Sequence, residues 1–322
     1  PIKVRHNTPY VYLLYYLISV LNYGSLVFPV MDPANGVVMA FYLGSSESGS
    51  TGQAAIIGVP YDGTSSHRVG SYLGPEALRN GSRSLGTYSP FLHRDLNDIE
   101  FVDRGDLDVP SGDAVKTVEI AASQVKNALT NGMYPVLLGG EHTVTLGAVQ
   151  ALVNVYPDLH LLQLDAHIGL RDVQIGEQLG HGSVMKRIME IISPERMYRL
   201  GVRSGTREEW ELADLRFSSE TCGRDIEGVL DSIPPDAPLY ISLDLDVFDP
   251  SLVPGVGNPE PLGMTYREFI NLVRGLCEYN VIGFDVVELS PKYDPSDVSA
   301  IVAASAVREL LLCMTDSRVS IN

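Results

Sequence analysis

Three short clusters of carboxylate and histidine side chains each follow a run of apolar residues. They are Gly139-Gly140-Glu141-His142-Thr143, Asp165-Ala166-His167, and Asp244-Leu245-Asp246. Short apolar runs that end in such residues are typical of buried parallel strands, whose carboxyl ends form the ligand-binding edge of an open α/β sheet. Carboxylate oxygens combined with imidazole nitrogens suit Mn²⁺, Fe²⁺ or Zn²⁺. The clusters therefore predict a hydrolytic metal centre.

The spacing within the clusters favours more than one ion. Residues two apart share a face of a strand, so Asp165 with His167, and Asp244 with Asp246, can each present two ligands to one point. His142 follows a Gly-Gly pair, where the backbone can approach closely. Three carboxylates and two imidazoles exceed one tetrahedral shell and suit two bridged ions. A single Asp at a strand end is more often a helix cap, but three successive clusters disfavour that explanation.

The elements that must position these residues alternate between strand and helix patterns. Strands are predicted at 54–59, 99–102, 134–138, 159–164, 197–202, 239–243 and 282–287. Helices are predicted from Pro75 and at 114–131, 144–155, 183–192, 266–279 and 298–314. Near-continuous apolar strands separated by helices predict an α/β fold: a single three-layer α/β/α domain with a mostly parallel sheet.

Composition excludes some partners. The chain has 322 residues, 45% of them hydrophobic, and a formal charge of −17, which argues against nucleic-acid binding. This charge is compatible with a small cationic substrate, although an acidic surface more often serves solubility. The cysteines Cys222, Cys277 and Cys313 have no metal-binding spacing, so we expect free thiols in a reducing cytoplasm.

Residues 1–40 differ from the rest, and we expect an N-terminal extension there, with the catalytic domain at 41–322. The apolar aromatic stretch 10–21 follows Lys3, Arg5 and His6 and resembles a signal-peptide core. It is too short for a membrane span. We favour a soluble arm over a secretory signal, and we predict no membrane partner; Met31 or Met39 could also be the true start.

The ordered motifs resemble the ureohydrolase (arginase/agmatinase) family over about residues 41–312. The resemblance rests on the first cluster, on 165–172, and on Ser242-Leu243-Asp244-Leu245-Asp246-Val247-Phe248-Asp249-Pro250 with its Pro/Gly-rich tail at 254–263. Gly58-Val59-Pro60-Tyr61-Asp62 and Gly74-Pro75-Glu76 are more similar to agmatinases than to arginases. The resemblance implies an arginase-like sheet of about eight strands and a cytoplasmic homo-oligomer, trimeric or hexameric. It also implies hydrolysis of agmatine to putrescine and urea, with guanidinobutyrase, formimidoylglutamase or arginase activity as alternatives.

The resemblance also assigns roles by position. It implies two Mn²⁺ ions held by His142, Asp165, His167, Asp244 and Asp246, with Asp165 also able to receive a proton. His181 would shuttle a proton to the leaving amine, and Glu288 would bind the guanidinium of the substrate. Without the resemblance, a histidine at the start of a helix, such as His181, is more often a neighbour of the helix cap or a solvent contact. A carboxylate at the end of a strand, such as Glu288, faces solvent about as often as it has a function.

One residue departs from the family pattern. The family has Asp-x-His-x-Asp, whereas this chain has Asp165-Ala166-His167-Ile168-Gly169, so one acid ligand is absent. By family position, the missing acid serves the ion beside His142. Three hypotheses follow: an enzyme with one weakened metal position, a hydrolase that uses one ion only, or an impaired homologue that acts as a binding or assembly subunit.

Overall fold

The computed structural model describes residues 41–46, 51–173, 178–213 and 225–315, together with two short strands near the N-terminus. The chain divides into two compact units, Pro1–Ala40 and Phe41–Asn322. In the first unit, β1 (Val30–Met31) pairs antiparallel with β2 (Val38–Met39). The aromatic stretch 10–21 and Cys222 lie outside the described residues.

A seven-stranded sheet forms the centre of the second unit. Its strands are β3 (Ala54–Val59), β6 (Phe101–Asp106), β7 (Tyr134–Gly139), β8 (His160–Leu164), β9 (Met197–Leu200), β10 (Leu239–Asp244) and β11 (Val281–Val287). Their order is β6-β3-β7-β11-β10-β8-β9, and every neighbouring pair is parallel. The prediction of a mostly parallel sheet is confirmed, with seven strands among the described residues where the resemblance implied about eight.

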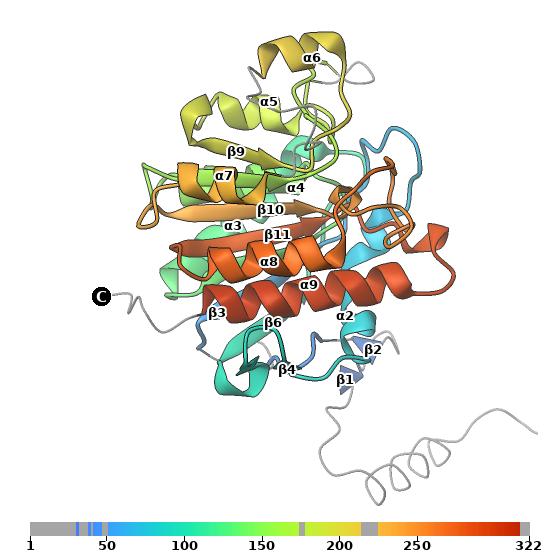
Figure 1. Ribbon diagram of the computed structural model, residues 1–322. Coiled ribbons are helices and arrows are strands. Elements are labelled where there is room, and N and C mark those ends of the chain that lie inside the picture. The colour runs from blue at the N-terminus through green and yellow to red at the C-terminus, as the bar shows by residue number, and fades with distance from the viewer. Residues whose placement is uncertain are drawn as a thin grey trace, which may run out of the picture. The chain divides into compact units, whose positions relative to one another are not determined.

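Helices cover both faces of this sheet. They are α2 (Gly74–Ser82), α3 (Ala114–Thr130), α4 (Val144–Leu152), α5 (Val184–Met189), α6 (Arg207–Leu212), α7 (Ile226–Ser232), α8 (Tyr266–Leu276) and α9 (Val298–Met314). Helix α9 packs on α2, α8 and β11, whereas α3 and α4 pack together on the other face (Figure 1). The three-layer prediction is therefore confirmed. No helix in the described ranges combines the length and apolar character that a membrane span requires.

Several predicted elements differ from the structure at their ends. Helices α4 and α8 each end three residues earlier than predicted, at Leu152 instead of 155 and at Leu276 instead of 279. Helix α5 runs from Val184 to Met189 instead of 183–192, and the chain continues as turns, with Ile191 N–H donating to Ile188 O. Strand β6 runs from Phe101 to Asp106 instead of 99–102; as an edge strand it can expose polar residues. Helices α6 and α7, of 6 and 7 residues, and the two-residue strands β4 (Tyr88–Ser89) and β5 (Arg94–Asp95) were not predicted.

The four central strands place their carboxyl ends together. Strands β7, β11, β10 and β8 are consecutive in the sheet, and each leads into one of the predicted clusters or into Glu288. The helix that follows β7 covers one face, whereas the helix that follows β11 covers the other. After β7 and β11 the chain thus continues toward opposite faces of the sheet. This leaves a crevice at the carboxyl ends of these strands, where open α/β sheets bind ligands.

A buried ion pair fastens α2 to the edge strand β6. The guanidinium of Arg79 donates from Nε to Asp103 Oδ2 at 2.8 Å and from a terminal nitrogen to Oδ1 at 2.9 Å. It also pairs with Asp106. Burial lowers the pKa of Arg79, but the hydrogen bonds and charges of Asp103 and Asp106 outweigh it and raise the pKa above its ordinary value. The Arg79 guanidinium therefore stays charged, and its hydrogen bonds hold α2 against β6.

We expect Arg79→Met to lower the free energy of unfolding by about 3–5 kcal/mol, because it leaves the buried Asp103 carboxylate without its cation. Urea denaturation followed by circular dichroism measures the change. The double variant Arg79→Met/Asp103→Leu should recover a large part of the loss, since no uncompensated charge remains. A loss below about 1 kcal/mol in the single variant would contradict this account.

Candidate metal centre and active site

A tight turn after β7 sets the position of His142. Gly140 N–H donates to Val59 O at 2.8 Å, and Glu141 N–H donates to Tyr61 O at 2.7 Å. A Cβ atom on Gly140 would lie 1.9 Å from Tyr61 O, so only glycine allows this approach. The turn thus directs the next side chain, His142, toward the ends of β8 and β10.

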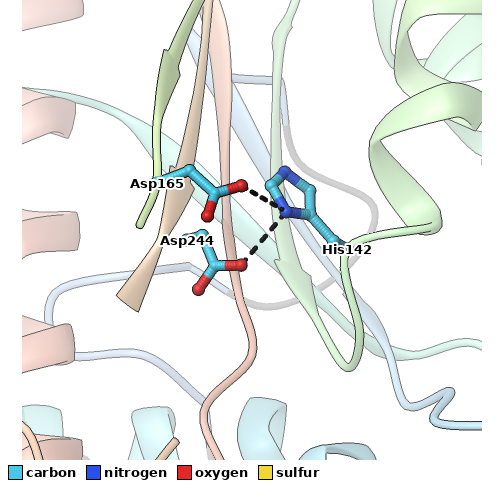
Figure 2. A group of neighbouring side chains, drawn as sticks. All are labelled: His142, Asp165 and Asp244. Atoms are coloured by element: carbon cyan, nitrogen blue, oxygen red, sulfur yellow. Dashed lines mark hydrogen bonds and ion pairs between the residues drawn. The ribbon is translucent and has the colours of Figure 1, made fainter. Parts of the chain in front are cut away.

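The first predicted ligand group comes together around His142. Its Nδ1 atom lies 3.2 Å from Asp165 Oδ2 and 3.1 Å from Asp244 Oδ2 (Figure 2). All three side chains are buried. On the other side of the ring, Nε2 lies 2.9 Å from Ser242 Oγ. A proton on Nε2 donated to Ser242 leaves Nδ1 as the lone-pair atom, which is the form that binds a metal.

The second ligand group comes together around His167. Its Nδ1 atom lies 2.8 Å from Asp246 Oδ2 and 3.6 Å from Asp165 Oδ1. The ligand atoms of His142, Asp165 and Asp244, and likewise those of Asp165, His167 and Asp246, lie within 4.8 Å of one another. Asp165 belongs to both groups. A carboxylate shared by two ligand groups is what two bridged ions require.

Backbone amides hold the carboxylates in place. His167 N–H donates to Asp165 Oδ1 at 2.6 Å, and Ala166 N–H donates to Asp246 Oδ1 at 2.9 Å. Asp246 N–H donates to Asp244 Oδ1 at 2.9 Å. Each aspartate thus has one oxygen held by the backbone, while its other oxygen points toward a ligand histidine. In Asp165 the held Oδ1 also lies 3.6 Å from His167 Nδ1, so the ligand atoms are oriented before a metal arrives.

The electrostatics of the cluster favour bound positive charge. Burial, with the charges of Asp246 and Asp165, raises the pKa of Asp244 well above its usual range. Burial lowers the pKa of His167, but Asp246 and Asp165 outweigh it and raise this pKa to about 12. The buried acids therefore attract protons onto the rings. Divalent ions would replace those protons, because metal binding releases protons from its ligands. Convergence, burial and donor types all fit a pair of divalent ions.

Glu288 adjoins the first ligand group. Its Oε1 atom accepts a hydrogen bond from His142 N at 3.0 Å, and its own N–H donates to Gly140 O at 2.7 Å. Its φ of 67° is left-handed, which is uncommon for a residue other than glycine. Such strain at a strand end is typical of functional residues. The carboxylate is buried against the ligand turn and also lines the cavity.

His181 lies beside Glu288. Its Nδ1 atom is 3.4 Å from Glu288 Oε1, and its Nε2 atom lies 2.9 Å from Ser66 Oγ. Burial lowers the pKa of His181, but the hydrogen bond and charge of Glu288 outweigh it and raise this pKa. The pKa of Glu288 is lowered, since its contact with His181 outweighs its burial. The structure thus brings both predicted residues together at the ligand cluster.

Glu141 is a buried acid for which no role was predicted. Its carboxylate accepts hydrogen bonds from Thr64 N at 3.0 Å, from Thr64 Oγ1 at 2.6 Å and from Thr143. Thr64 Oγ1 in turn accepts from His181 N at 3.0 Å. Burial and the charge of Glu288 raise the pKa of Glu141 to about 7. Glu141 therefore ties the loop after β3 to the loop that carries His181.

Gly169 lies at the edge of the cluster in a left-handed conformation, with φ of 71°. A Cβ atom there would meet Met185 Cγ of α5 at 3.1 Å. The nearby Asp172 is exposed and pairs with Arg187 at 3.2 Å, so in this arrangement it supplies no replacement ligand. Gly169 lines the cavity, and its lack of a side chain therefore bears directly on the site.

A cavity of about 370 Å³ opens over the two ligand groups. It brings all five predicted ligands together with His181, Glu288 and Gly169. Its remaining wall includes Ser66, His67, Arg171, Glu209, Asn258 and Glu260. The volume matches that of a small-molecule site.

Other polar residues that support the site lie within the strands themselves. Ser242 Oγ donates to the buried Asp285 Oδ1 at 2.8 Å, and both interrupt apolar strands. Gln163 Nε2 donates to Asp165 Oδ2 at 2.8 Å. A polar residue within an otherwise apolar strand is the signal that could have indicated these supporting residues.

The sequence and the fold are similar to those of the same group of proteins. Residues 52–313 match the Arginase family. An agmatinase of Bacillus anthracis is 36% identical over 276 residues, covering 84% of this chain and 95% of that protein. The human mitochondrial guanidino acid hydrolase is 31% identical over 277 residues, covering 81% and 78%. The crystal structure of the agmatine ureohydrolase of Thermoplasma volcanium has a TM-score of 0.73 and 30% identity, covering 93% and 97%.

The fold and site thus define a metal-dependent hydrolase that acts on guanidino compounds. The chain belongs to the arginase family. The predicted similarity to the agmatinase branch of the ureohydrolases is confirmed by the agmatinase relatives.

Proposed function

We propose that this chain is an agmatinase, which hydrolyses agmatine to putrescine and urea with Mn²⁺ as its cofactor. The observation that carries the proposal is the position of Glu288 and His181 beside the His142 ligand group, in the same cavity as the second ligand group. The family similarity and the agmatinase relatives support the choice of substrate.

Each of these residues of the cavity has its own role in the proposed reaction. The Glu288 carboxylate would bind the planar guanidinium of the substrate by a bidentate charge-assisted pair. His142, Asp165, His167, Asp244 and Asp246 would hold two Mn²⁺ ions, and Asp165 would be shared. Two such ions lower the pKa of a water, which makes it a nucleophile near neutral pH. Asp165 would accept the proton that the water loses, and His181 would donate one to the leaving amine.

We infer that the metal position beside His142 is the weaker of the two. Its ligands among the described residues are His142, Asp165 and Asp244, and the acid that the family pattern has at Gly169 is absent. Changes outside the ligand shell already cost about 10–100-fold in metal affinity or activity. The loss of a ligand should cost at least as much.

We expect His181→Ala to slow agmatine hydrolysis by about 100-fold while it retains the fold and the bound metal. A positioned acid or base typically contributes about 10²–10⁴-fold, and water can replace it in part in an open cavity. Initial rates of urea release measure the effect, with metal content and melting temperature as controls. An unchanged rate would show that His181 only supports its loop.

Urea release tests the proposed function directly. The protein is assayed with added Mn²⁺ for urea release from agmatine, arginine and guanidinobutyrate, which differ in the group opposite the reacting carbon. Formimidoylglutamate, whose reacting carbon carries a hydrogen in place of the third nitrogen, is assayed for formamide release. A preference for agmatine supports the proposal. Turnover of another of these compounds, without agmatine hydrolysis, would assign a different ureohydrolase activity.

Two other functions follow from specific observations. Arg171 lines the cavity, and an arginine there could bind the carboxylate of a guanidino acid, the class named for the human relative. Gly169 favours a one-ion hydrolase or an impaired homologue kept as a binding or assembly subunit. Metal stoichiometry separates the two-ion enzyme from the one-ion enzyme, and the absence of turnover with every substrate would favour the subunit.

We further propose that residues 41–322 are the catalytic domain of a cytoplasmic homo-oligomer, trimeric or hexameric, and that residues 1–40 are an extension. The family similarity begins at residue 52. The Sγ atoms of Cys277 and Cys313 each donate a hydrogen bond to Val273 O, at 3.3 and 3.5 Å, as thiols do, and this suits a reducing compartment. Light scattering on the purified protein tests the oligomeric state.

A further inference from the structure

Arg203 has a set of contacts that the proposed mechanism does not use. It lies three residues after the end of β9 at Leu200 and is half-buried. In the described part of the chain it forms no ion pair with a carboxylate. Its guanidinium instead donates to six backbone carbonyl oxygens at 2.7–3.4 Å, those of Gly201, Asp246, Val247, Phe248, Glu260 and Pro261.

Two of the segments that Arg203 contacts form part of the site. A terminal nitrogen donates to Asp246 O at 2.7 Å and to Glu260 O at 2.8 Å. Asp246 is one of the proposed ligands, whereas Glu260 lies in the cavity wall with its Oε1 atom 3.8 Å from His167 Nε2. One side chain therefore fixes a ligand loop and a wall segment relative to each other.

The next residue, Ser204, extends these contacts toward His167. Ser204 N–H donates to Ala166 O at 2.9 Å, and its carbonyl accepts from Ile168 N at 3.1 Å. Its hydroxyl donates to Glu260 Oε1 at 2.8 Å. Arg203 and Ser204 together thus contact the segments that carry the three acids beside the His167 ring.

The chemistry of these contacts requires a guanidinium. Arginine presents five N–H donors in a rigid plane, whereas a lysine ammonium offers three donors from one point. A lysine at position 203 could satisfy only some of the carbonyls. The loops at 246–248 and 260–261 would then lose their common donor.

We propose that Arg203 is a positioning residue, which couples the metal position formed by Asp165, His167 and Asp246 to the cavity wall at residues 258–260. The proposal rests on the proposed function only for its substrate readout. Metal affinity and substrate KM should therefore change together when Arg203 is replaced, although Arg203 is not among the residues that line the cavity.

Arg203→Lys tests the proposal, with Arg308→Lys as a matched control. Arg308 is a buried arginine of α9 that contacts Glu309 and Gly86 O, and it is not among the residues that line the cavity. Mn²⁺ affinity is measured by calorimetry on metal-free protein, melting temperature by circular dichroism, and KM by urea release at saturating Mn²⁺. We expect Arg203→Lys to weaken the tighter Mn²⁺ site by about 10–100-fold and to raise KM. Arg308→Lys should lower the melting temperature without changing Mn²⁺ affinity.

Unchanged Mn²⁺ affinity in Arg203→Lys, or an equal loss in Arg308→Lys, would overturn the proposal. If Arg203→Lys does not fold, Arg203→Gln is measured in its place; failure of both to fold would mean a general structural role and would also overturn it. Mn²⁺ affinity is measured without substrate, so a wild-type protein that releases no urea would refute the proposed function and leave this test intact.

Discussion

Glu288→Gln should abolish detectable urea release while both Mn²⁺ affinity and the fold remain. The amide keeps the shape of the side chain and an oxygen that can accept the hydrogen bond from His142 N, which is 3.0 Å long in the native protein. It removes the negative charge that would pair with the substrate guanidinium in a desolvated cavity. The amide also offers only one acceptor oxygen, so the bidentate pair between carboxylate and guanidinium cannot form, and we expect the largest loss of turnover here.

The matched variant is Glu288→Ala, which removes the charge and the acceptor for His142 N together. Comparison of the two separates substrate binding from support of the ligand turn. Retained metal in Glu288→Gln, with reduced metal in Glu288→Ala, would assign both roles to one carboxylate. Calorimetric titration with Mn²⁺ and initial rates on agmatine provide the measurements. Loss of Mn²⁺ with retained substrate affinity in Glu288→Gln would contradict the proposed role.

The sequence was sufficient to predict that the expected metal ligands lie together at one edge of the sheet. Apolar runs before Asp165 and Asp244 indicate parallel strands, and parallel strands bring their carboxyl ends to one edge. Spacing of two residues also places His167 beside Asp165. These inferences need only local patterns, which is why they hold without any knowledge of the order of the strands.

The supporting contacts could not be predicted, because they join segments far apart in the chain. Arg203 reaches carbonyls more than 40 residues away, and nothing near it in the sequence indicates them. Glu288 has a left-handed backbone and donates to Gly140 O, which follows the neighbouring strand β7 and lies far from Glu288 in the sequence. Short helices such as α6 have too few turns to produce a clear hydrophobic period.

Gly169→Asp should raise Mn²⁺ affinity at the weaker position by more than about 100-fold and increase urea release at limiting Mn²⁺ in parallel. A carboxylate in the ligand shell contributes more than the outer residues, whose loss already costs about 10–100-fold. The left-handed φ of 71° is a cost, but aspartate is among the residues that tolerate this region. Elemental analysis, calorimetry and rates titrated against Mn²⁺ measure the result.

Gly169→Asn is the matched control, because it carries the same backbone strain and nearly the same shape without the charge. A second comparison tests the contact with Met185, because a Cβ atom at position 169 would lie 3.1 Å from Met185 Cγ. In Gly169→Asp/Met185→Ala that contact is relieved, with Met185→Ala alone as the reference. A gain only in the double variant would identify packing against α5 as the obstacle. Two tightly bound ions in the native protein, with no gain in either aspartate variant over its reference, would contradict the weakened position; water or another side chain would then complete the shell.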